Sequence, residues 1–254
     1  MSPEPVPTPR RAVLIGAGGR MGQALLQAAA GSPTLAFTAA IVSGASPLVG
    51  RPVPGGALHY RADLAAALAG AQVAIDFSSA AATLHNLTAC RSAGTPLLLG
   101  TTGFAPALEA EFAAAAREIA LLVAANTSLG VTVLAELLRF AAAALPGQFT
   151  VSITESHHAG KRDAPSGTAL ALAQVVRSAR PAAAAIDIES IRAGDIVGEH
   201  AVRFASAGEE LTLAHKASDR GLFATGALAA ALWLSAQPPG RYGMRDVVAI
   251  KTAT

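Results

Sequence analysis

A short apolar segment, residues 11–15, leads directly into a glycine-rich stretch from Gly16 to Gly22, and this junction constrains the fold more than any other feature. The apolar run predicts a buried strand, and residues 20–30 that follow have helical spacing. A strand, a glycine turn and a helix in this order open a βαβ unit, in which parallel strands are covered by helices on both faces. We therefore expect the chain to begin with an α/β domain of the Rossmann type.

The glycines are spaced as GxxGxxG, at Gly16, Gly19 and Gly22, because Met21 stands where the pattern GxGxxG would have its third glycine. Glycine allows positive φ and lets the backbone approach a pyrophosphate. The N-terminus of the following helix adds free N–H groups and partial positive charge. A tight turn without a ligand would need the same glycines, but the position after the first strand favours dinucleotide binding.

The end of the second expected strand bears on the choice of cofactor. An acidic residue there usually holds the ribose 2′-hydroxyl, but this strand ends in Val42 and Ser43, and the next acidic residue is Asp63. A carboxylate would repel a 2′-phosphate, so its absence removes that repulsion. With Arg20 and Arg51 as candidate phosphate partners, we expect NADPH, or use of both NADPH and NADH.

The rest of the chain shows two patterns, which we interpret as two domains. Up to residue 127, apolar strands alternate with helices; beyond it, strands cluster with two helices, which indicates an α+β module. The expected division is a disordered proline-rich tail (1–10), a dinucleotide-binding domain (11–127 and 219–254) and a second domain (128–218). Antiparallel strands are expected at 149–155, 186–191, 200–204 and 211–215, and a final strand at 246–250.

Composition excludes several classes of function. Only 14% of the residues are charged, the formal net charge is +2, and basic residues form no run, so nucleic acid is not an expected partner. The single cysteine, Cys90, cannot form an intramolecular disulfide. The start of the chain lacks the apolar stretch of a signal peptide, and the uncharged stretch 221–240 is alanine-rich with a Pro-Pro, which favours a buried helix over a membrane span. We expect a cytoplasmic protein.

Residues 155–169 hold the densest set of reactive side chains. His157 and His158 are adjacent, and Lys161 is one of only three lysines in the chain. Histidine can donate a proton near neutral pH, and lysine adds positive charge. The following Pro-Ser-Gly-Thr and apolar run predict a helix N-terminus that suits a carboxylate, with the Thr168 hydroxyl as a further donor. This segment predicts a site for a small anionic substrate.

Plainer interpretations of this segment exist. Adjacent histidines on a strand point to opposite faces, so one of them can be structural, and Lys161 can be a solvated surface charge. A metal site needs three or four convergent ligands, and the sequence offers no such set, so we expect no metal.

The stretch Ser-His-His-x-x-Lys-x-Asp-Ala-Pro-Ser-Gly-Thr-Ala, residues 156–169, closely resembles the signature of the 4-hydroxy-tetrahydrodipicolinate reductase family, also called dihydrodipicolinate reductase. The resemblance covers nearly the whole chain after the proline-rich tail. It includes the segments Gly16–Gly22, Ile75–Phe77, Gly100–Phe104, Ala124–Asn126, Arg192–His200, His215–Ser218 and Met244–Val247.

The resemblance implies a reaction and a set of residues. The cyclic hydroxy-dicarboxylate is reduced with loss of water to tetrahydrodipicolinate, on the diaminopimelate route to lysine, with hydride from NADPH or NADH. His157 matches the proton donor and Lys161 the second catalytic residue, while His158, Gly167 and Thr168 match substrate-binding positions. The second domain would bind substrate and form a homotetramer. Cofactor positions are matched by Gly16, Ala17, Gly18, Gly19, Arg20, Met21, Gly100, Thr101, Thr102, Ala124, Ala125, Asn126 and Thr127.

The sequence departs from the family at some positions, and two other functions stay open. Val42 and Ser43 stand where many members carry an acid and an arginine, and Thr127 replaces a common aromatic residue.

Another two-domain Rossmann dehydrogenase, such as one acting on an amino-acid semialdehyde, would share the glycine loop but would not need the block from His157 to Thr168. A non-catalytic nucleotide sensor would be expected to have lost His157 or Lys161.

Overall fold

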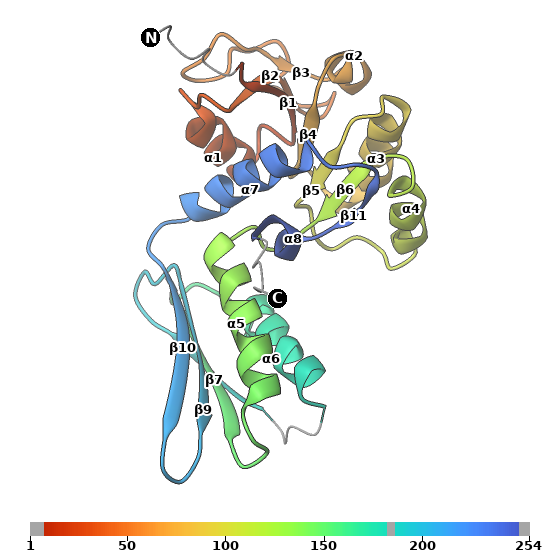
Figure 1. Cartoon of the computed structure of the whole chain (residues 1–254). Helices are drawn as coiled ribbons and strands as arrows, with labels where there is room; N and C mark the ends of the chain where they lie inside the picture. The colour runs from red at the N-terminus through yellow and green to blue at the C-terminus, as the bar shows by residue number, and fades with distance from the viewer. Residues whose placement is uncertain (1–7, 182–185, 249–254) are drawn as a thin grey trace, which may run out of the picture. The chain divides into compact units, whose positions relative to one another are not determined.

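The computed structural model describes residues 8–181 and 186–248 (Figure 1), which divide into two units. The described part of the first unit is 8–127 together with 223–248, and that of the second is 128–181 together with 186–222. Each unit has its own sheet and its own hydrophobic core.

The first unit is built on a seven-stranded sheet in the order β11-β6-β5-β4-β1-β2-β3, in which every pairing is parallel. Its strands are β1 (Arg10–Ile15), β2 (Leu35–Ile41), β3 (Tyr60–Arg61), β4 (Val73–Asp76), β5 (Leu97–Leu99), β6 (Ala120–Val123) and β11 (Gly240–Tyr242). Because β1 lies between β2 and β4, the strand order reverses beside it. In such sheets ligands bind outside the carboxyl ends of the strands at this reversal.

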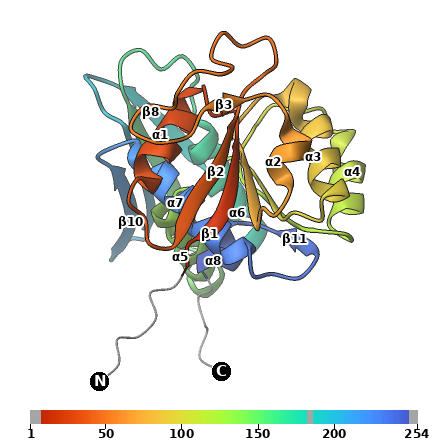
Figure 2. The ribbon, with the colours of Figure 1, turned by 90° about the horizontal axis from the view of Figure 1, so that it is seen from above.

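Helices cover both faces of this sheet, as expected. They are α1 (Arg20–Ala29), α2 (Leu64–Leu68), α3 (Thr83–Ser92), α4 (Leu108–Ala115), α7 (Gly221–Leu234) and α8 (Met244–Val248), with a 3₁₀ turn η1 at Ala80–Ala82. Figure 2 shows α2, α3 and α4 on one side of β1 and β2, and α1 and α7 on the other. Val13 and Ile15 of β1 pack in the α2–α4 core, and Leu14 between them is also buried. Burial on both sides explains why the strand is continuously apolar.

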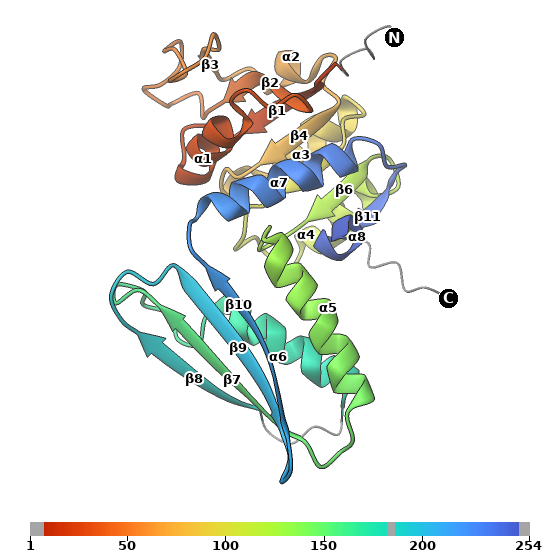
Figure 3. The same cartoon turned by 60° about the vertical axis from the view of Figure 1, so that its left-hand side comes forward.

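The second unit has a four-stranded sheet in the order β10-β9-β7-β8. Its strands are β7 (Thr150–His157), β8 (Asp187–Arg192), β9 (Gly198–Ala205) and β10 (Glu210–Ala217). The helices α5 (Leu129–Ala144) and α6 (Gly167–Ala179) lie side by side against one face of it (Figure 3). Along β7, Val151 and Ile153 join the core under these helices. Since side chains alternate along a strand, Glu155 and His157 point to this same face.

Several expectations about individual elements are wrong. β8 runs parallel to β7, because the chain crosses through α6 between them, and only the pairs β7–β9 and β9–β10 are antiparallel. The expected strand 246–250 is helical over residues 246–248, while residues 249 and 250 lie outside the described part. The Gly243 N–H donates to the Asp246 carboxylate and the Asp246 N–H to the Gly243 carbonyl, which starts α8 instead.

The short elements β3, α2 and β11, each five residues or fewer, were not among the expected ones. Residues 1–7 of the expected tail lie outside the described part, and Arg10 already belongs to β1, so the expected tail is too long. Among the helices the structure describes, none combines the length and apolar character that crossing a membrane requires.

Candidate active site

The glycine loop after β1 is held by backbone contacts that leave no room for side chains. Gly16 has φ +83°, and both its N–H and that of Ala17 donate to the Ile41 carbonyl, at 3.0 and 2.9 Å. A Cβ on Gly16 would lie 2.5 Å from the Phe77 carbonyl oxygen, and a Cβ on Gly22 would overlap the Gly16 carbonyl. The first and last glycines are therefore required to seat α1 against the ends of β1, β2 and β4.

The N-terminus of α1 fits an anion. Gly19 at its N-cap has no side chain to occupy the first-turn N–H groups, and the first turn contains no acidic residue. In α5 and α6, by contrast, the side chains of Ser128 and Ser166 accept hydrogen bonds from the first turn. Because an uncapped helix N-terminus favours phosphate, the loop residues Gly16 to Met21 fit the pyrophosphate of a dinucleotide.

A second loop of the first unit is organised by Asp76, which sequence reasoning did not single out as a site residue. Its buried carboxylate accepts hydrogen bonds from the Ser78 N–H and the Asn86 amide, at 2.8 and 2.9 Å, and the Thr101 hydroxyl lies 3.4 Å away. Burial raises the pKa of Asp76, and these hydrogen bonds offset only part of that effect. The Gly100 N–H donates to the Asp76 carbonyl at 2.9 Å, so Gly100 and Thr101 are both held by Asp76 at the end of β5, whereas Thr102 is exposed.

The segment after β6 is only partly available to a ligand. Ala124 is buried, and its N–H donates to the Leu99 carbonyl at 3.0 Å, whereas Ala125 is exposed. Thr127 is buried, and its hydroxyl donates to the Phe223 carbonyl at 2.7 Å. The Thr127 side chain thus ties the chain to the start of α7.

The structure gives Asp63, the first acidic residue after β2, a role in capping a helix. The Asp63 carboxylate accepts a hydrogen bond from the Ala66 N–H at 2.9 Å and caps α2. Val42 is buried and Ser43 is exposed, so the end of β2 presents no carboxylate to a ribose.

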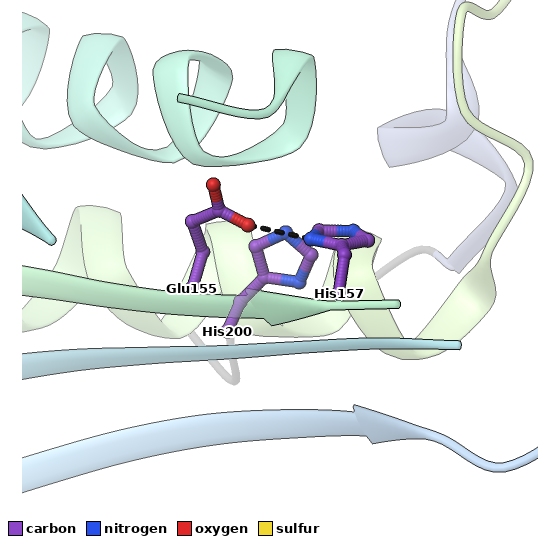
Figure 4. Close-up of side chains that lie close together, drawn as sticks. All are labelled: Glu155, His157 and His200. Carbon is purple, nitrogen blue, oxygen red and sulfur yellow. Dashed lines mark hydrogen bonds and ion pairs between the residues drawn. The ribbon is translucent and has the colours of Figure 1, made fainter. Parts of the chain in front are cut away.

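In the second unit, Glu155 binds His157 directly. The Nδ1 atom of His157 lies 2.5 Å from Glu155 Oε2, as Figure 4 shows. Glu155 is fully buried and His157 is 9% exposed. Arg192 donates two hydrogen bonds to the Glu155 carboxylate, at 3.0 and 2.7 Å, and the Ser166 N–H donates a third at 3.2 Å.

These contacts determine the charge of Glu155. Burial alone would raise its pKa, but hydrogen bonds from Arg192, Ser190, His157 and Ser166 outweigh burial and lower the pKa to about 2. The carboxylate is therefore ionised and can only accept hydrogen bonds, so the Nδ1 atom of His157 carries a proton.

His200 completes this buried group. Its ring meets the ring of His157 edge-on, with 5.2 Å between the ring centroids (Figure 4). The Nε2 atom of His200 lies 3.1 Å from Ser166 Oγ. Burial, with a smaller effect of His157, lowers the pKa of His200 to about 4, so it is neutral near pH 7.

Glu155, His157 and His200 have ligand atoms within 4.8 Å of one another, as in a metal site. Arg192 already binds both Glu155 oxygens, however, and its positive charge opposes a second cation. The donor set therefore suits a hydrogen-bonded histidine better than a metal ion.

Lys161 lies in the turn that follows β7. Its Nζ donates to both carboxylate oxygens of Asp163 at 2.8 Å, and its N–H donates to the His158 carbonyl. A hydrogen bond from Lys161 lowers the pKa of Asp163, so this pair is charged. At the start of α6, Ser166 caps the Ala169 N–H, and a Cβ on the exposed Gly167 would meet no atom within 4 Å. The segment from His157 to Thr168 therefore carries the expected proton donor, the lysine and an accessible helix N-terminus.

Sequence models of one family match both halves of the chain: dihydrodipicolinate reductase, N-terminus, over residues 10–127, and dihydrodipicolinate reductase, C-terminus, over residues 130–248. The chain belongs to the dihydrodipicolinate reductase family. A relative from Anaeromyxobacter dehalogenans (strain 2CP-1), named 4-hydroxy-tetrahydrodipicolinate reductase, is 40% identical, covering 95% of this chain and 98% of its own length. Its namesake from Thiobacillus denitrificans is 42% identical over 95% and 99%.

A solved structure has the same fold. The dipicolinate-bound dihydrodipicolinate reductase from Paenisporosarcina sp. TG-14 superposes with a TM-score of 0.82 over 92% of this chain and 97% of that one, at 21% identity. These findings confirm the expected family of pyridine-nucleotide-dependent reductases and the Rossmann-type sheet with a second domain. They set aside the alternative of another dehydrogenase family.

Sequence reasoning singled out His157, His158 and Lys161 as candidate site residues but missed the side chains that hold His157 and Lys161. Glu155 stands two residues before His157, and on a strand this spacing puts both side chains on one face, which is a signal that could have been used. Arg192 and His200 begin and end a segment that resembles the family, but the sequence did not place them beside Glu155, because β8 and β9 bring them to β7 from more than 30 residues away.

Proposed function

We propose that this chain reduces 4-hydroxy-tetrahydrodipicolinate to tetrahydrodipicolinate with loss of water, with His157 as the proton donor and Lys161 as the second catalytic group. The observation that carries the proposal is the buried, ionised Glu155 on Nδ1 of His157, in the same segment as Lys161 and the α6 N-terminus. The family and the names of its members supply the substrate.

Binding of a dicarboxylate follows from the segment after β7. The start of α6 is accessible beside Gly167, where an added Cβ would meet no atom within 4 Å, and a helix N-terminus in this position suits one carboxylate. Lys161 and His158 are the remaining groups of the segment that can bind the anionic substrate. Lys161 would exchange its contact with Asp163 for one with the substrate.

Proton donation uses the outer nitrogen of His157. Its Nδ1 is committed to Glu155, whereas Nε2 faces Gly198, where a Cβ would stand only 3.1 Å away. Glycine at this position leaves room beside Nε2, the atom that gives a proton to the carbon next to the reduced one. When bound, the nicotinamide supplies the hydride.

The first unit would hold the cofactor through Gly16 to Met21 at the pyrophosphate, with Gly100 to Thr102 and Ala124 to Thr127 beside the nicotinamide. We propose that NADPH is accepted at least as well as NADH, because no carboxylate stands at the end of β2 to repel a 2′-phosphate. Arg20 and Arg51, both exposed, are the candidate partners of that phosphate.

Steady-state oxidation of NADPH and of NADH, with substrate generated freshly by the preceding synthase, tests the activity and the cofactor together. The variant His157→Gln is expected to lower kcat by about 10²–10⁴-fold while cofactor affinity stays unchanged. Folded wild-type protein without turnover would refute the function. A strong preference for NADH would refute only the cofactor proposal.

We further propose a homotetramer built through the second sheet. The face of this sheet away from α5 and α6 carries the small side chains of Ser152, Thr154, Ala201 and Ala214, each exposed or half-buried, together with the ion pairs Arg203–Glu210 and Lys216–Glu199. Small side chains on an uncovered sheet allow close packing of another sheet. Light scattering coupled to gel filtration would show a mass near four chains, and a monomer would refute this assembly.

A further inference from the structure

We propose that Glu155 and Arg192 are positioning residues that act together on His157, and that Arg192 also fixes the loop bearing Lys161. This inference rests on the proposed role of His157 as the proton donor. Neither residue would touch the substrate or the cofactor, and both would act through the groups they hold.

The contact between Glu155 and His157 selects one arrangement of the imidazole. Both side chains come from β7, two residues apart, and both are buried. With Nδ1 donating to the carboxylate at 2.5 Å, the ring can neither flip nor exchange its Nδ1 proton without breaking a buried charged hydrogen bond. Nε2 is thereby the nitrogen available for proton transfer, as when a carboxylate orients a catalytic histidine.

Arg192 joins this carboxylate to the lysine loop. It ends β8 at the position paired with His157 in the parallel register. Its guanidinium donates to both Glu155 oxygens and, through Nη2, to the Asp163 carbonyl at 2.6 Å. The Asp163 carboxylate in turn holds Lys161 Nζ. The Arg192 guanidinium therefore fixes the distance between Glu155, which holds His157, and Asp163, which holds Lys161.

Lysine could not take the place of Arg192. The three hydrogen bonds use the fixed fork of a guanidinium, whereas an ammonium group is a point charge on a flexible stem. The charges also balance, because Glu155 and Arg192 cancel each other and His200 beside them is neutral.

A double-mutant cycle on the full-length enzyme separates positioning from a structural role. Glu155→Gln is expected to lower kcat by about 10- to 10²-fold with the KM for substrate and cofactor nearly unchanged. In a His157→Gln background the same change is expected to lower kcat by less than about twofold, because the residue through which it acts is gone. Equal losses in both backgrounds would overturn the inference.

Arg192→Lys serves as a second variant if Glu155→Gln does not fold. It is expected to lower kcat by about tenfold in the wild-type background. In the His157→Gln background it is expected to lower kcat by less than about twofold. Arg91→Lys is the matched control, since Arg91 makes a similar forked pair with Glu118 in the first unit. Equal loss in Arg91→Lys and Arg192→Lys would overturn the inference.

Nitrogen-15 NMR of labelled histidine gives a readout that does not depend on turnover. The His157 signal, identified by its loss in His157→Gln, is expected to show a proton on Nδ1 in the wild type and an altered pattern in Glu155→Gln. The same pattern in both proteins would overturn the inference. Unchanged turnover in His157→Gln would instead refute the proposed proton donor, so the two failures are distinguishable.

Discussion

Acid should weaken the second unit through Glu155, by an amount that follows from its surroundings. The pKa of Glu155 is lowered from 4.5 to about 2 in the folded protein. A depressed pKa means that the unfolded chain binds the proton more tightly, so the stabilisation is complete above pH 4.5 and is lost as pH falls through 2. A difference of about 2.5 pKa units corresponds to about 3 kcal/mol, of which about 1.5 kcal/mol is lost between pH 7 and pH 3.5. Because the group is fully buried, solvent screening does not reduce this value much.

The measurement is urea unfolding of the wild type and of Glu155→Gln at pH 7, 4.5 and 3.5, followed by far-ultraviolet circular dichroism. The difference in the free energy of unfolding between the wild type and Glu155→Gln is expected to shrink by about 1.5 kcal/mol from pH 7 to pH 3.5. The single tryptophan, Trp233, lies in α7, so its fluorescence follows the first unit separately and serves as the control. Asp76, whose pKa is raised, also lies in the first unit and does not enter the comparison. Parallel pH dependence in the two proteins would refute the charge assignment.

Three further outcomes follow from local geometry. Gly198→Ala places a methyl group 3.1 Å from Nε2 of His157, so kcat should fall by about tenfold or more while the melting temperature changes little; unchanged kcat would contradict the proposed role of that nitrogen. Gly22→Ala brings a Cβ against the Gly16 carbonyl and should weaken cofactor binding, measured by calorimetry, more than it changes substrate KM. Asp63→Ala removes the cap of α2 and should lower the free energy of unfolding by about 1 kcal/mol, leaving the ratio of kcat/KM for NADPH and NADH unchanged; a changed ratio would assign Asp63 to the ribose.

The beginning of the first unit could be predicted because its signals are local. An apolar run, glycines at fixed spacing and an alanine-rich helix together permit few backbone conformations. In the structure, Gly16 packs against the Phe77 backbone and Gly22 against the Gly16 carbonyl. The segment from His157 to Thr168 was predictable for a similar reason, since its reactive side chains and its helix N-terminus are adjacent in the chain.

The elements that were missed or wrong depend on distant or subtle interactions. The direction of β8 was wrong because only the crossover through α6 decides whether it runs parallel to β7. The expected strand at 246–250 was wrong because two reciprocal hydrogen bonds between Gly243 and Asp246 start a helix in a segment of strand-forming residues.

The sequence by itself determined the Rossmann-type fold and the family, and it supplied the candidate groups for moving a proton or binding an anion, because these follow from short-range patterns. The tertiary structure alone decided which partners control those groups. Arg192 reaches Glu155 only because β7 and β8 pair in parallel, with His157 opposite Arg192, and the lowered pKa of Glu155 depends on that buried contact. A carboxylate's charge depends on the atoms around it, and those atoms are brought together by strand register rather than by proximity in sequence.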